Sequence, residues 1–118
     1  MIVDYIEELK PIADKLKRID SDLYINLGRN HHSDKFRLVF SSDNQKYRES
    51  FEKVSKETGM ATGGVAIINY SYLKTKEYPT IGLELYSKGS SFPGTEEDIE
   101  KVVNFIIEAI NDHDKTRK

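Results

Sequence analysis

Cysteine is absent from this sequence of 118 residues. Its absence excludes disulfide bonds, thiolate metal sites and cysteine nucleophiles. Long apolar runs are also missing, which excludes a membrane-spanning helix. The first residues, MIVDYIEELKP, carry acidic side chains where a secretory signal has basic ones. We therefore expect neither a signal peptide nor contact with a membrane, and we expect the protein to be cytoplasmic.

Several motifs that carry chemistry are missing as well. The three histidines show no H-x-H or H-E-x-x-H spacing, and residues 88–94 lack the G-x-S-x-G elbow of a serine nucleophile. The glycines in residues 57–67 follow a predicted helix and precede a strand, whereas a phosphate-binding loop runs from a strand into a helix. The sequence predicts no catalytic residue, no metal site and no cofactor.

The composition is that of a folded, highly charged domain. Leu, Ile, Val and Phe make up 31 of the 118 residues, enough for a modest core. The 18 Lys and Arg residues are balanced by 20 Asp and Glu residues, a net charge of −2. A dedicated duplex-binding protein usually has a basic excess, so the overall charge counts against that role.

Hydrophobic periodicity and turn residues predict seven elements. They are a helix over 3–18, strands over 22–28 and 35–41, a helix over 42–59, strands over 63–73 and 80–87, and a helix from 96 onward. Pro11 predicts a kink in the first helix or its division into two short helices. Ser42 or Asp43 is expected to cap the second helix and Gly59 to end it, and Thr95 is expected to cap the third.

The second and third elements read as one hairpin. Both alternate apolar and polar residues, and the turn-forming residues 28–34 lie between them. The strand over 63–73 is rich in β-branched residues, which predicts burial on both faces. The strand over 80–87 places Ile81, Leu83 and Leu85 toward the core.

The elements together predict a single α+β domain over residues 1–118, with a basic tail at about 114–118 that frays. Its order is α-β-β-α-β-β-α. We expect a four-stranded, mostly antiparallel sheet with the helices packed on one face. The other face then displays mixed polar and aromatic residues: Tyr24, Asn26, Arg37, Val39, Glu84 and Tyr86.

The predicted hairpin carries the strongest candidate site. Residues 29–37, RNHHSDKFR, contain three formal cations, two histidines and one acid, so they offer several donors to a phosphate or to a partner's carboxylates. Tyrosine and arginine are also favoured at protein interfaces. The candidate binding residues are Arg29, His31, His32, Lys35, Arg37, Tyr24 and Tyr86.

These features favour a small non-enzymatic binding module that contacts another protein, of the inhibitor, immunity or adaptor type. Its Lys, Ile, Asn and Tyr usage is typical of an AT-rich bacterial or phage genome. A protein partner is the leading expectation, and a homodimer is a further one. The alternative is a protein that binds nucleic acid, a nucleotide or a phosphate ligand through residues 29–37. A third hypothesis is an enzyme that uses His31, His32 or Asp34.

Overall fold

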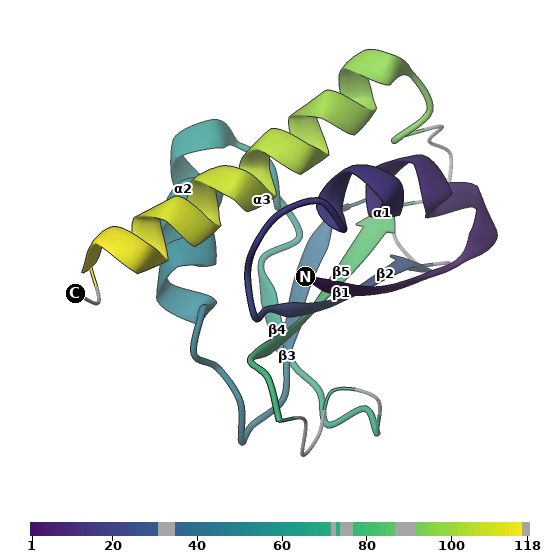
Figure 1. Cartoon of the computed structure of the whole chain (residues 1–118). Helices are drawn as coiled ribbons and strands as arrows, with labels where there is room; N and C mark the ends of the chain where they lie inside the picture. Colours follow the sequence, from purple (N-terminus) through teal and green to yellow (C-terminus); the bar gives the residue numbers. More distant parts are fainter. Residues whose placement is uncertain (31–34, 72, 74–76, 87–91, 117–118) are drawn as a thin grey trace.

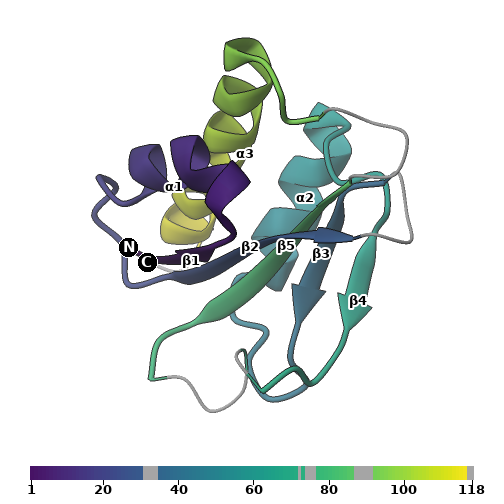
Figure 2. The same ribbon diagram turned by 90° about the vertical axis from the view of Figure 1, so that its right-hand side faces the viewer.

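The computed structural model describes residues 1–30, 35–71, 73, 77–86 and 92–116. A five-stranded sheet lies at its centre, in the order β1-β2-β5-β3-β4. The strands are β1 (Ile2–Tyr5), β2 (Tyr24–Asn30), β3 (Arg37–Phe40), β4 (Val65–Ile67) and β5 (Thr80–Tyr86). All three α-helices cover the same face of the sheet (Figures 1 and 2). This arrangement confirms the α+β class and the one-sided helical layer.

The pairing of the strands differs from the prediction. The sheet has five strands, and three of its four pairings are parallel; only β3 and β5 run antiparallel. No β2–β3 hairpin forms, because β5 lies between the two strands. An alternating pattern determines which face of a strand is buried, but it does not determine which strand lies beside it.

The N-terminal segment is the clearest error in the predicted elements. Instead of a helix over 3–18, it forms β1, the 3₁₀ helix η1 (Glu7–Leu9) and the short helix α1 (Lys10–Leu16). β1 pairs with β2, with Val3 opposite Ile25. Pro11 lies in the first turn of α1 and does not kink it. A proline there loses no helical hydrogen bond, because the first N–H groups of a helix have no partner within it.

Helix α2 (Arg48–Thr58) begins later than predicted. Ser41 and Asn44 form an isolated β-bridge, which holds residues 41–44 outside the helix. Ser42 is not a helix cap, because its N–H and its Oγ both donate to Asn69 Oδ1, at 2.8 and 3.0 Å. The end of the helix is as predicted: Gly59 takes the left-handed conformation, with φ of 71°.

The predicted strand over 63–73 is much shorter than expected and is not buried. β4 is an edge strand, and 43% of Ile67 is exposed. The chain then turns, and the buried Leu73 packs on the sheet face that the helices leave free. Thr80 Oγ1 donates a hydrogen bond to the carbonyl oxygen of Leu73 at 3.1 Å. The segment therefore covers part of that face instead of extending the sheet.

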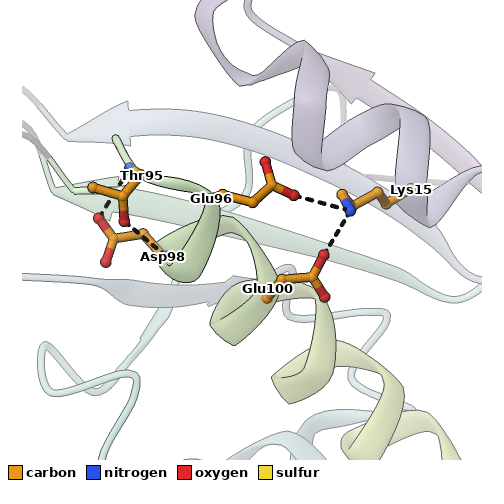
Figure 3. Close-up of polar contacts among 5 residues, drawn as sticks. All are labelled: Lys15, Thr95, Glu96, Asp98 and Glu100. Carbon is orange, nitrogen blue, oxygen red and sulfur yellow. Dashed lines mark hydrogen bonds and ion pairs between the residues drawn. The ribbon is translucent and has the colours of Figure 1, made fainter.

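Helix α3 (Glu96–Thr116) begins where the sequence predicts. Thr95 Oγ1 accepts from the N–H of Asp98 at 3.1 Å, and Asp98 Oδ2 accepts from the N–H of Thr95 at 3.4 Å (Figure 3). Figure 3 also shows Lys15 of α1 between Glu96 and Glu100, with its Nζ 2.6 Å from Glu100 Oε1. The start of α3 is thus fixed both by its own cap and by α1.

Aromatic side chains hold α3 against the rest of the core. Phe105 of α3 meets Phe51 of α2 at 5.6 Å and Phe36 at 5.8 Å, both edge to face. All three rings are at most 1% exposed. Such contacts add to the burial of apolar area, which is the main source of stability. Phe105 therefore links both neighbouring segments to α3.

Candidate functional site

The carboxyl ends of β1, β2 and β5 lie at one edge of the sheet, because these strands are parallel. β3 begins at this edge, since it runs antiparallel to β5. In open α/β sheets ligands bind at the carboxyl ends of the parallel strands. Two ion pairs lie at this edge among the described residues, one on each face of the sheet.

The pair on the face without helices joins β3 to β5. Arg37 stands opposite Glu84 in the register, and its Nη2 lies 2.6 Å from Glu84 Oε1. The Glu84 side chain is 15% exposed and that of Arg37 is 29% exposed. An ion pair with so little water contact is screened less than a surface pair. Glu84 is thus a reachable carboxylate held in one position by a cation.

The pair on the helical face anchors the end of β2. Arg29 Nη1 donates to the carbonyl oxygen of Phe92, which lies just before α3. Arg29 Nη2 is 3.5 Å from Glu8 Oε2, in η1. The arginine side chain is only 10% exposed, so it connects three segments of the fold and leaves little surface for a partner.

The structure does not gather the predicted binding residues into one surface. Arg29 and Arg37 lie on opposite faces of the sheet, because Arg29 stands beside Leu85 and Arg37 beside Glu84, and successive residues of β5 point to opposite faces. β5 also separates their strands. Tyr24 is only 9% exposed and begins β2, at the other edge, so it is not displayed as expected. Lys35 is exposed, next to β3.

The other predicted residues are only partly placed. Tyr86 ends β5, opposite Asn30 in the register. His31 and His32 lie outside the described residues, as does Asp34 of the enzyme hypothesis. The binding role of the seven residues therefore stays a prediction.

Glu84 is the residue that the sequence reasoning placed on an outward face without giving it a role. Its signal was available: it is the single charged residue in TIGLELY, a strand whose alternate positions are all apolar. A carboxylate in the second half of a central parallel strand falls at the ligand-binding edge. Recognising Glu84 as a site residue required the strand order, which the hydrophobic periodicity does not determine.

A polar cavity lies at the opposite edge of the sheet, where β2 and β5 begin. It has a volume of about 840 Å³ and is lined by Asp20, Asp22, Glu77 and other residues. Tyr47 and the buried His113 stack in its wall, with ring centroids 4.0 Å apart. Burial raises the pKa of the Tyr47 hydroxyl, and this effect outweighs a hydrogen bond with Ser21.

Within the described ranges no three His, Cys, Asp or Glu side chains converge as metal ligands. Another cavity, of about 630 Å³, lies between the end of α2 and α3, with Met60, Phe92 and Phe105 among its lining residues. The described helices include none that is both long and apolar enough to cross a bilayer.

No protein-family model matches the chain, and no curated protein matches it. Solved structures do match. Ami1 of Mycobacterium abscessus, an N-acetylmuramyl-L-alanine amidase, has a TM-score of 0.64 and 12% identity; the match covers 87% of this chain and 60% of Ami1. CwlV of Bacillus (Paenibacillus) polymyxa, whose catalytic domain is an N-acetylmuramoyl-L-alanine amidase, has a TM-score of 0.60 and 17% identity, with 86% and 61% covered.

The CwlD amidase of Clostridioides difficile, solved in complex with the GerS lipoprotein, has a TM-score of 0.64 and 14% identity, with 93% and 63% covered. The chain thus has the fold of these amidases and spans about three fifths of their length. This finding overturns the prediction of a non-enzymatic inhibitor, immunity or adaptor module, together with its nucleic-acid or nucleotide alternative, because the matching fold is that of enzymes.

Proposed function

We propose that this chain hydrolyses an amide bond next to an N-acetylmuramoyl group. The observation that carries the proposal is the shared fold: solved structures that match most of this chain are named for this one reaction. The site at the carboxyl ends of β2 and β5 supports it, because a carboxylate and a guanidinium lie together there.

The reaction adds water across the C–N bond of an amide. The water oxygen bonds to the carbonyl carbon, the C–N bond breaks, and the leaving nitrogen takes up a proton. The products are the carboxylate of the muramoyl group and the free amine of L-alanine. Such a step is accelerated by a general base that takes the proton of the water and by a positive group near the developing oxyanion.

Glu84 and Arg37 fit these two roles in the proposal. The Glu84 carboxylate accepts the proton of the attacking water and returns it to the leaving amine. Arg37 holds that carboxylate through its Nη2 and places positive charge beside the reacting carbonyl.

The test is digestion of purified bacterial peptidoglycan, followed by labelling and mass spectrometry of new amino-terminal alanine. We expect the wild-type chain to release it and Glu84→Gln to lower the rate by about a hundredfold or more, as for loss of a general base. Glu52→Gln is the matched control, because Glu52 also pairs with an arginine at 2.6 Å but lies on α2. No release by the wild type refutes the proposed reaction. Equal rates for the wild type and Glu84→Gln refute the role of Glu84.

A further inference from the structure

Gly28 stands beside Glu84 on the free face of the sheet. The two residues are opposite each other in the register of β2 and β5, and adjacent strands lie about 4.8 Å apart. On the other side of Glu84 stands Arg37 of β3. The proposed catalytic carboxylate therefore has a bare backbone on one side and a cation on the other.

Nothing among the described residues requires a glycine at this position. A Cβ added to Gly28 would meet one described atom within 4 Å, Asn26 Oδ1, at an ordinary contact distance of 3.8 Å. No positive φ requires a glycine there either. A glycine inside a strand is destabilising, and it often marks a place where a ligand or another backbone approaches closely.

The other strand and loop glycines between residues 28 and 82 are each explained by the structure. Gly59 and Gly64 have positive φ angles of 71° and 77°. A Cβ on Gly63 would lie 2.6 Å from the carbonyl oxygen of Phe36, and one on Gly82 would lie 3.3 Å from the Cβ of Val39. Gly28 is the exception among these five.

We infer that Gly28 is a specificity-determining residue, whose missing side chain leaves room for the N-acetylmuramoyl sugar of the substrate over β2. This inference rests on the proposed function and adds an orientation to it. The surface on the Gly28 side offers the Asn26 amide and the exposed carboxylate of Asp4, which stands opposite Asn26 in the register of β1 and β2. Both groups can hydrogen-bond the hydroxyl and acetamido groups of a sugar. The Arg37 side is cationic and suits the peptide, whose carboxylates are negative.

The test measures binding in the Glu84→Gln background, so that the probe is not consumed. The probes are N-acetylmuramoyl-L-alanine and N-acetyl-L-alanine, which lacks the sugar, each titrated by NMR. We expect the muramoyl probe to bind more tightly, and Gly28→Val to weaken it about tenfold, equal to about 1.4 kcal/mol. Binding of the acetyl probe should not change.

The matched control is Ala66→Val, which adds bulk to the same sheet face two strands away from β5. It should leave the binding of both probes unchanged. Gly28→Val should not lower the melting temperature, because its Cβ has room and valine favours strands. A lower melting temperature would assign Gly28 a role in folding and overturn the inference.

Three other results overturn the inference: no binding of the muramoyl probe, no effect of Gly28→Val, or an equal loss for both probes. These results are separate from the digestion assay. Hydrolysis with an unaffected Gly28→Val variant would refute the sugar position alone. Sugar-dependent binding over Gly28 without hydrolysis would refute the proposed reaction alone.

Discussion

Replacing Arg37 with leucine removes the partner of the carboxylate at the proposed site. Glu84 is only 15% exposed, so water compensates for little of the lost contact. A hydrogen bond to a charged group contributes about 1.5–3 kcal/mol, and breaking a fully buried pair costs about 3–5 kcal/mol. Because Arg37 itself is 29% exposed, we expect the free energy of unfolding to fall by about 2 kcal/mol.

A double-mutant cycle separates the pair from the packing around it. We expect Arg37→Leu and Glu84→Leu each to cost about 2 kcal/mol, and the double variant to cost less than the sum by a coupling energy of about 2 kcal/mol. The assay is equilibrium unfolding in urea at neutral pH. A matched cycle on Arg48 and Glu52, which lie at the same 2.6 Å but are 41% and 36% exposed, serves as the control.

The control pair should couple by only about 0.3–0.5 kcal/mol, as surface pairs within a helix do. If the Arg37–Glu84 coupling is no larger than this, burial does not strengthen the pair. The view of Glu84 as a carboxylate held in place by Arg37 is then wrong. A large coupling supports both the geometry and the description of the site.

Two further predictions concern the ends of α3. Thr95→Ala removes the acceptor of the Asp98 N–H and should lower the free energy of unfolding by about 1 kcal/mol, measured by urea denaturation; an unchanged midpoint would show that the cap is not needed. Hydrogen bonding from the Gly94 N–H lowers the pKa of Asp98, and the Lys53 side chain lowers that of Asp112. Because these pKa values are lower in the folded state, the two carboxylates add to the free energy of unfolding above the unfolded pKa of about 3.9. This stabilisation is lost as the pH falls below that value and through the folded pKa values. Thermal melting between about pH 2 and pH 6 should show this loss, and Asp112→Asn should reduce its slope; the same slope in both proteins would contradict the assignment.

The parts of the fold that the sequence predicts are those with strong local signals. Helix α3 has a capping threonine, acidic residues in its first turn and a continuous apolar stripe, so its start follows from local chemistry alone. β5 follows Pro79 and buries Ile81, Leu83 and Leu85, as its alternation indicates. Gly59 ends α2 for the conformational reason that predicts it.

The parts that were missed depend on partners distant in the sequence. β1 is a strand because β2 lies beside it, although its residues also fit the apolar face of a helix. Arg29 and Arg37 are eight positions apart and were expected on one surface, but β5 inserts between their strands. Glu84 and Gly28 acquire a shared surface only through that same insertion, so the sequence alone could not show that they lie side by side.

The central position of β5 has a consequence for how the sheet is assembled. β1 with β2 and β3 with β4 form two separate pairs, and the strand that joins them is the last of the five to be synthesised. Until residue 86 has left the ribosome, β2 and β3 each present an edge of unpaired backbone groups, the kind of edge that recruits other chains. A chain truncated before β5 should therefore self-associate, and closure of the sheet should be the slow step of folding, since it joins segments more than fifty residues apart.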